Sequence, residues 1–311
     1  MGPDHPAARE ERLDEMPSLA RLYSKALGRS ASLVLASRRP AGGAVPDVAY
    51  VVEGVRADPA GLAAYEELLG EPGTDVLPPG YVHVLAFPLA MALMVRPDFP
   101  LPVLGLVHVE NRVVQRRALH LEDVLTVRAW AEPLRPHRRG TQVDLVVDVS
   151  VGTERVWQGT STYLAKHPSR DQAGAPPAPD TTSAAPLSRD HAEVPRAQAG
   201  PTAVWRLGSD TGKRYASVSG DRNPIHVSRL GARAFGFPRP IAHGMYTAAR
   251  ALATIGRARG EAFTWEVSFA KPVLLPSRVA LDVTETGGGH AFTATRHGRD
   301  TVHLTGSVRP L

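Results

Sequence analysis

The sequence predicts an α+β protein of two similar units, each with a central helix wrapped by an antiparallel sheet. An apolar helical segment followed by four strand-like segments occurs twice along the 311 residues. Between the two lies a proline- and alanine-rich stretch, residues 168–201, whose composition predicts a linker because it buries little apolar surface. The expected domains are an N-terminal unit over residues 1–167, this linker, and a C-terminal unit over residues 202–311.

In the N-terminal unit the apolar segment Pro88–Val95 predicts the central helix, with proline acceptable in a first turn. In the C-terminal unit the central helix is predicted over 244–255, where apolar residues recur at the i, i+3, i+4, i+7 spacing. Glycine-containing polar segments, 152–154 and 298–300, predict a hairpin near the end of each unit. The predicted strands are 106–114, 124–131, 142–151 and 155–164, then 264–269, 278–284, 291–296 and 301–308.

Composition excludes several classes of protein. The absence of cysteine rules out disulfides, thiolate nucleophiles and cysteine-ligated metal centres. The most apolar window, Val82–Val95, is shorter than the ~20 residues of a membrane helix, and the first residues form no apolar leader, so we expect a cytoplasmic protein without a membrane partner. The net charge of +5 comes with aromatic residues at only 6%, which argues against nucleic-acid binding and favours a compact anionic ligand.

The segment from Tyr215 to His226 carries the chemistry. Gly220 permits a sharp turn, and Pro224 disfavours a helical conformation at Asn223. The turn can bring the carboxylate of Asp221 and the imidazole of His226 to one pocket, where together they can hold a water and move protons. Taken alone, the two residues also fit an ordinary turn in which an aspartate caps a local amide.

The whole string resembles the signature of the MaoC-like dehydratases, the (R)-specific enoyl-CoA hydratases. That signature has an aromatic and a small residue, then Gly-Asp-x-Asn-Pro-aliphatic-His, and a small residue six positions later. It is filled here by Tyr215, Ser219, Gly220, Asp221, Asn223, Pro224, Ile225, His226 and Ala232. The resemblance implies a double hot-dog fold, in which an N-terminal unit without the motif helps to shape the acyl pocket.

The resemblance also implies the reaction and the roles of the residues. The family adds water reversibly, with syn geometry, to trans-2-enoyl thioesters, and Asp221 and His226 match its acid–base pair. Gly244 matches the glycine whose amide polarises the thioester carbonyl, at a helix N-terminus that favours an anion. Asn223 is expected to brace the loop, and which of Asp221 and His226 is the base stays open.

Three further residues are candidates for substrate binding: His243, which could instead pack or cap at the helix start, and Arg233 and Arg239, which could meet a CoA phosphate or an acidic carrier protein. Asp221, His226 and His243 also form a candidate metal-ligand set. Because the catalytic pair already accounts for two of them, we expect no metal and no cofactor.

The leading hypothesis is therefore a hydro-lyase, an (R)-specific enoyl-CoA hydratase or 3-hydroxyacyl-thioester dehydratase. Alternatives are a dehydratase for carrier-protein thioesters in fatty-acid or polyketide synthesis, a non-catalytic acyl-thioester-binding subunit, and a hot-dog thioesterase. Two units in one chain are compatible with a monomeric pseudo-dimer or a homodimer. The length of the acyl chain and the physiological direction are not encoded in the motif.

Overall fold

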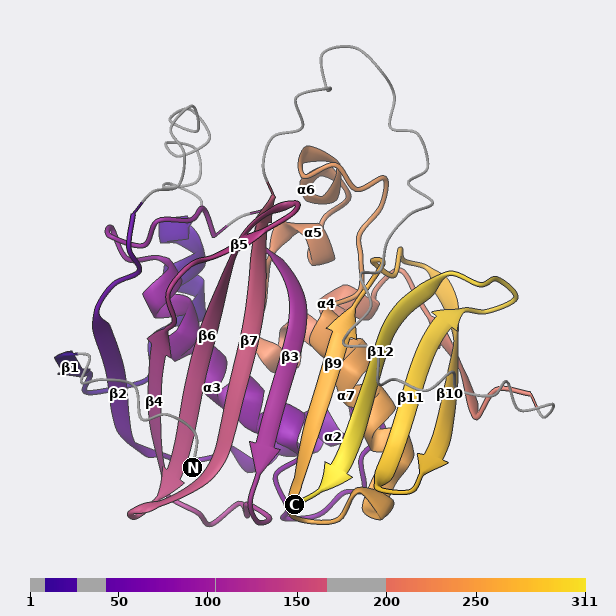
Figure 1. Ribbon diagram of the computed structural model, residues 1–311, viewed down its shortest axis with the longest axis horizontal. Coiled ribbons are helices and arrows are strands. Elements are labelled where there is room, and N and C mark those ends of the chain that lie inside the picture. The colour runs from indigo at the N-terminus through magenta and orange to yellow at the C-terminus, as the bar shows by residue number, and fades with distance from the viewer. Residues whose placement is uncertain (1–8, 27–42, 104, 167–199) are drawn as a thin grey trace.

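The computed structural model describes residues 9–26, 43–103, 105–166 and 200–311 (Figure 1). Of the predicted linker, all but residues 200 and 201 lie outside the described residues. The strands are β1 (Arg9–Arg12), β2 (Val48–Val55), β3 (Val107–Gln115), β4 (Leu125–Ala131), β5 (Arg135–His137), β6 (Gly140–Val151), β7 (Glu154–Lys166), β8 (Ala203–Leu207), β9 (Phe263–Phe269), β10 (Ser277–Thr286), β11 (Gly289–Arg296) and β12 (Val302–Pro310). The helices are α2 (Pro59–Leu69), α3 (Pro79–Met94), α4 (Thr211–Ser219), α5 (Pro224–Val227), α6 (Arg229–Ala234), α7 (Gly244–Ile255) and the 3₁₀ turn η1 (Gly256–Arg259).

Within these ranges the twelve strands form one sheet, in the order β1-β2-β4-β6-β7-β3-β9-β12-β11-β10-β8 with β5 beside β6. Helix α3 packs on β2, β4 and β6 of the first half, and α7 packs on β11 of the second half and touches α3 (Figure 1). Each half is thus a central helix wrapped by antiparallel strands. The predicted α+β double hot-dog fold is confirmed.

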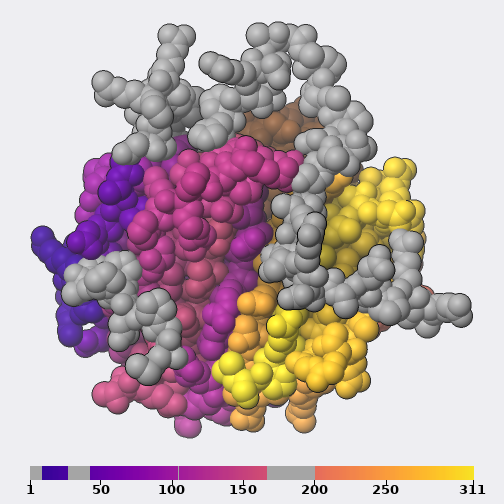
Figure 2. All heavy atoms as spheres, in the orientation of Figure 1, coloured from indigo at the N-terminus to yellow at the C-terminus, as the bar shows by residue number. Residues whose placement is uncertain are grey.

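The two halves of the sheet join at a seam where β3 pairs with β9 in antiparallel register, from Glu110 opposite Ser268 to Gln115 opposite Phe263. Trp265 and Val267 of β9 point inward and are buried, as the alternation along a strand requires. In the uncovered lower part of Figure 2 the atoms of the two units lie side by side along this seam. The seam makes one continuous core from the two units.

The prediction for the first central helix is wrong at its start. Helix α3 begins at Pro79, nine residues before Pro88, which lies inside the helix. The helix tolerates this proline because α3 is buried on nearly all sides, so tertiary packing outweighs the lost N–H. The first residue of the central helix α3 is therefore Pro79, which, like Pro88, has no backbone N–H. The first residue of the other central helix, α7, is Gly244, which has one.

Both predicted hairpins are present. β6 turns into β7 at Gly152, and β11 turns toward β12 near Gly298, and both glycines have positive φ. No helix among the described residues is long and apolar enough to cross a membrane.

Candidate active site

The motif lies between α4 and α5. Helix α4 ends at Gly220, whose φ of 70° lies in the left-handed region and turns the chain sharply. Asn223 then caps α5, because its side-chain oxygen accepts a hydrogen bond from the N–H of Ile225 at 3.3 Å. The N–H of Asn223 also donates to Oδ1 of Asp221 at 3.1 Å. These bonds fix the short segment that separates Asp221 from His226.

His226 is buried in α5, and its Nδ1 donates to the carbonyl oxygen of Ile241 at 2.8 Å. A carbonyl only accepts, so Nδ1 carries the hydrogen and Nε2 of the neutral ring keeps a free lone pair. Burial lowers the pKa of His226, although the nearby Asp221 carboxylate opposes this shift. At neutral pH the ring is therefore an uncharged base.

Asp221 is ionised in this environment. Burial favours the neutral carboxyl, but His243, His226, the Tyr23 hydroxyl and the Asn223 amide together hold the pKa of Asp221 below its ordinary value. Its Oδ1 accepts hydrogen bonds from the hydroxyl of Tyr23 and from the Asn223 amide. The side chain remains 23% exposed, so the carboxylate is still reachable from the pocket.

His243 lies directly beneath the pair. Its ring stacks on His226 with the centroids 3.7 Å apart, and its Nε2 donates to the backbone oxygen of Asp221 at 3.0 Å. Burial and the neighbouring His226 lower the pKa of His243 to about 3. With only 3% of its side chain exposed, His243 supports the loop and has little surface to offer a substrate.

The spacing of the three side chains suits a single water. One carboxylate oxygen of Asp221 and one ring nitrogen each of His226 and His243 lie within 4.8 Å of one another. Two hydrogen bonds of about 2.8 Å through one water can span such a gap. In the candidate metal-ligand set, Nε2 of His243 donates to a carbonyl and Oδ1 of Asp221 already accepts two hydrogen bonds. Nδ1 of His243 has no hydrogen-bond partner among the described residues.

Gly244 begins helix α7 just after His243, where the first amides of a helix have no partner within it. A Cβ at this position would lie 3.0 Å from the ring of Phe269, so a side chain would crowd the narrow space beside the amide. The helix dipole adds a partial positive charge at the same place. The start of α7 at Gly244 therefore has the features of a site that favours a negatively charged oxygen.

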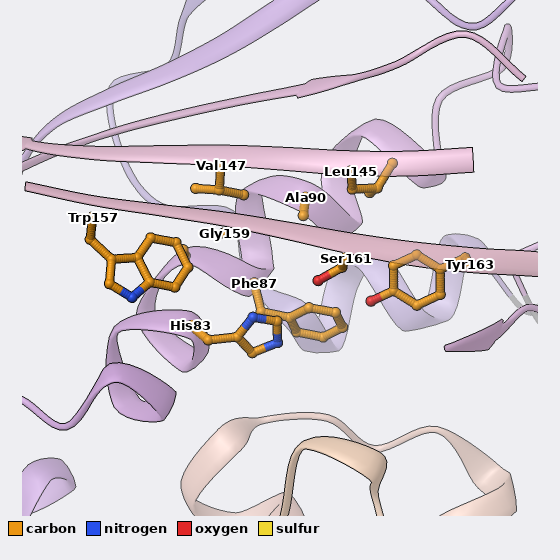
Figure 3. Close-up of a pocket in the computed structure, with 10 residues that line it drawn as sticks. His83, Phe87, Ala90, Leu145, Val147, Trp157, Gly159, Ser161 and Tyr163 are labelled. Atoms are coloured by element: carbon orange, nitrogen blue, oxygen red, sulfur yellow. The ribbon is translucent and has the colours of Figure 1, made fainter. Parts of the chain in front are cut away.

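A narrow pocket lies in the N-terminal unit, between α3 and the strands β6 and β7. Two of its lining residues, His83 and Tyr163, are close enough for the charge of Asp221 to affect their pKa values. Its cavity volume is about 10 Å³, room for about one water, and its lining residues are His83, Ala86, Phe87, Ala90, Leu145, Val147, Trp157, Gly159, Ser161 and Tyr163. In Figure 3 the rings of His83 and Phe87 lie on α3 opposite Ser161 and Tyr163 of β7. The lining is mostly apolar, with His83, Ser161 and Tyr163 among its polar residues.

Two further histidines link this pocket to the catalytic loop. His108 of β3 stacks on Tyr163 at 4.7 Å and contacts Phe269 at 5.1 Å between ring centroids. The charge of Asp221 acts on both His83 and His108, but burial dominates and lowers their pKa values to about 4 and about 3. Both are neutral at physiological pH.

The two candidate arginines lie on the segment between the motif and α7. Arg233, in α6, is exposed, and Arg239 is partly buried. Neither forms an ion pair with any residue that the structure describes, so both guanidinium groups are available to an anion.

Acid is expected to unfold the protein early. The pKa values of His83, His108 and His243 are about 4, 3 and 3, against about 6.5 for unfolded chain, so the unfolded state binds more protons below pH 6.5. The free energy of unfolding should then fall as the pH drops from 6.5 toward 4. Urea unfolding followed by circular dichroism at several pH values measures this slope, and His108→Asn should reduce it. A stability that stays constant from pH 7 to 4.5 would contradict the assignment of buried neutral rings.

Sequence reasoning does not identify four residues that surround Asp221 and the pocket. His83 could have been noticed in the sequence, since it is a polar residue in an otherwise apolar segment. His108 and Tyr163 lie in strands where only the pairing of β3 with β7 brings their rings together. Tyr23 is 198 positions from its partner Asp221, and no local pattern marks it.

The chain was compared with known proteins. The sequence profile of the family described as "MaoC like domain" matches residues 186–308. The curated protein 3-hydroxyacyl-thioester dehydratase X of Mycobacterium tuberculosis is 39% identical over 267 residues, which are 86% of this chain and 91% of the relative.

Solved structures agree with this similarity. The crystal structure of HtdX of Mycobacterium tuberculosis superposes with a TM-score of 0.72 at 38% identity, over 85% of this chain and all of that one. A MaoC-like dehydratase from Phytophthora capsici is only 18% identical, with a TM-score of 0.63 over 85% of this chain and 94% of its own. The second likeness concerns the fold alone.

Proposed function

Because the chain belongs to the MaoC-like dehydratase family, we propose that it catalyses the reversible syn addition of water to trans-2-enoyl thioesters, giving (3R)-3-hydroxyacyl thioesters. It is a hydro-lyase. The observation that carries the proposal is the unbroken motif, which brings a carboxylate and a neutral imidazole together beside the start of α7. The carboxylate also acts on His83 and Tyr163, two residues that line the pocket of the N-terminal unit. The similar mycobacterial protein is named a 3-hydroxyacyl-thioester dehydratase, which supports the same reaction here.

Water is held between the Asp221 carboxylate and Nε2 of His226. The pair takes a proton from the water as its oxygen bonds to C3 of the substrate, and it returns a proton to C2. The pair thus ends each turnover in its starting state, and the net change is the addition of one water. Such positioned acid–base groups contribute about 10²–10⁴ in rate.

Negative charge forms on the thioester oxygen during this step. The N–H of Gly244 is placed to donate to that oxygen, and the dipole of α7 adds to the stabilisation. A donor of this kind is typically worth ~10²–10³ in kcat. Asn223 and His243 keep the loop in position through their bonds to Asp221 and Ile225.

The substrate extends in two directions from the reacting carbons. Its acyl chain enters the pocket of the N-terminal unit, past His83 and Phe87 toward Ala90. At the other end, Arg233 and Arg239 meet phosphate groups of CoA or an acidic carrier protein. The N-terminal unit, the linker and the C-terminal unit keep the boundaries 167/168 and 201/202 in this proposal, and the seam supports a monomeric pseudo-dimer.

The test is the loss of the ultraviolet absorbance of the conjugated enoyl thioester when trans-2-enoyl-CoA is mixed with the protein. We expect the wild-type protein to consume the enoyl thioester and to form only the (3R) product. In His226→Asn the rate should be lower by a factor of about 10²–10³. His303→Asn is the matched control, because His303 is also buried and its Nδ1 also lies 2.9 Å from a carbonyl, that of Lys271.

The control should retain activity close to that of wild type. Formation of the (3S) product would refute the proposed stereochemistry. No consumption of either CoA or carrier-protein thioesters, with binding retained, would favour a non-catalytic acyl-thioester-binding subunit.

A further inference from the structure

We propose that Tyr23, which comes from the N-terminal unit, is a positioning residue of the hydration site: its hydroxyl holds one oxygen of Asp221 and so directs the other oxygen to the water. The inference rests on the proposed role of Asp221 in hydration. It adds a residue that lies outside the motif and in the unit that has no motif of its own.

The two carboxylate oxygens of Asp221 have different contacts. Oδ1 accepts from the Tyr23 hydroxyl and from the Asn223 amide at 3.1 Å. Oδ2 is the oxygen that faces the imidazoles, 3.7 Å from Nε2 of His243. With Oδ1 occupied by two donors, the carboxylate cannot rotate freely, and Oδ2 is the oxygen left for the water.

Tyr23 is held firmly where this contact requires it. It is buried in the helical residues 19–26, together with Leu22 and Ala26. One turn earlier in this helix, Leu19 packs so closely on Gly220 that a Cβ there would lie 2.6 Å from Leu19 Cδ1. Preceding the helix, strand β1 pairs with β2, and the N–H of Leu13 donates to the oxygen of Val51 at 2.9 Å. The N-terminal segment is thus anchored to the first unit at one end and to the catalytic loop at the other.

The hydrogen bonds to Oδ1 act on this carboxylate together with the imidazoles of His243 and His226, which have the larger effect in lowering its pKa. Burial raises the pKa values of the tyrosines and lowers those of the histidines, so these groups are neutral at pH 7. No lysine or arginine of the described chain acts appreciably on Asp221. The titratable groups that face it are Tyr23, His83, His108, Tyr163, Tyr215, His226 and His243.

The two donors on Oδ1 add to the effect of the His243 and His226 imidazoles, and together these groups lower the pKa of Asp221 against the effect of burial. Removal of the hydroxyl should raise the pKa of the carboxyl toward its unfolded value and beyond. The same change lets the carboxylate rotate, which lowers the fraction of molecules in which Oδ2 faces the water.

The experiment is Tyr23→Phe, which removes one hydroxyl and keeps the ring. We expect kcat for hydration to fall about tenfold, KM to change less than about twofold, and the acid limb of the kcat–pH profile to move up by about one unit. The matched control is Tyr50→Phe, since Tyr50 is also buried in the first unit and its hydroxyl accepts from Nη1 of Arg96 at 2.6 Å. That control should leave kcat and the pH profile unchanged.

A second readout does not depend on activity. Titration of the ¹³C-labelled carboxyl of Asp221 by NMR, with its signal assigned by its absence in Asp221→Asn, gives its pKa in wild type and in Tyr23→Phe. A raised pKa with lowered kcat supports the proposal. An unchanged pKa and kcat overturns it, as does a change in KM alone, which would make Tyr23 only a wall of the pocket. If the pKa of Asp221 rises in Tyr23→Phe but the wild-type protein hydrates no enoyl thioester, the proposed function is rejected. The contact between Tyr23 and Asp221 would still be supported in that case.

If Tyr23→Phe does not fold, Leu19→Ala takes its place. It loosens the packing of the helix on Gly220 but keeps the hydroxyl. A smaller shift of the acid limb in the same direction supports the proposal, and no shift overturns it.

Discussion

Asp221→Asn is expected to lower kcat for enoyl-thioester hydration by about 10³–10⁴ and to change KM by less than about threefold. Asparagine has nearly the shape of aspartate, so the loop held by Asn223 and His243 should persist. What is lost is a negatively charged proton acceptor next to His226. Steady-state kinetics with a trans-2-enoyl-CoA measures the effect.

Asp282→Asn is the control for this substitution, because Asp282 lies exposed on β10 in the same unit and its carboxylate takes no part in the site. It should keep the full rate. If Asp221→Asn retained more than about a tenth of the wild-type kcat, the assignment of Asp221 to the acid–base pair would be wrong. The double variant Asp221→Asn/His226→Asn should be no slower than about the worse single variant, since two residues that act as a unit are not additive.

Glu71→Ala is expected to destabilise the fold by about 3–5 kcal/mol. Glu71, which follows α2, forms an ion pair with Arg259 of η1 at 3.2 Å, and 3% and 13% of their side chains are exposed. The pair joins the two units, since Glu71 follows α2 of the first and Arg259 belongs to η1 of the second. Removal of the carboxylate leaves a buried guanidinium without its charge partner. Thermal unfolding followed by circular dichroism should show Tm lowered by roughly 5–15 °C.

The cost arises from the unpaired charge rather than from loss of a favourable pair. Burial raises the pKa of Glu71 even though Arg259 opposes the shift, so desolvation outweighs the attraction. The double variant Glu71→Leu/Arg259→Met should therefore recover most of the lost stability. A double variant as unstable as Glu71→Ala would indicate that the ion pair itself stabilises the fold.

Arg112→Ala is the control at an exposed ion pair, because Arg112 pairs with Glu266 across the seam. This substitution should lower the free energy of unfolding by less than about 1 kcal/mol.

The central helix and the last four strands of the second unit could be predicted because their signals are local. Helix α7 has one apolar face, and its predicted bounds, 244–255, agree with the structure. The eight predicted strands correspond to β3, β4, β6, β7 and β9–β12, with ends that differ by only one or two residues for most of them. The motif identified the loop because Gly220 and Asn223 fix its conformation through their own backbone preferences.

The remainder depends on contacts that no short window contains. Helix α3 is apolar on nearly every side, so no amphipathic face marks its start, and Pro88 was a misleading boundary. The segments β1, β2, α2 and β8 were not predicted, although Asp58, Pro59 and Gly70 mark the two ends of α2. β1 and β8 form at the two edges of the sheet, where β2 and β10 give them a partner. Tyr23 reaches Asp221 only because both units fold against each other.

The seam between the two halves of the sheet also means that one strand edge stays unpaired during synthesis of the chain. β3 needs β9 as its second partner, yet roughly 100 residues separate the end of β7 from the start of β9. At about 5–20 residues per second, the ribosome takes roughly 5–20 s to supply that partner. During this time the finished first unit presents β3 as an open edge, and the outward charges of Glu110 and Arg112 are its defence against pairing with another nascent chain. Heavy overexpression should therefore yield strand-exchanged oligomers joined through β3.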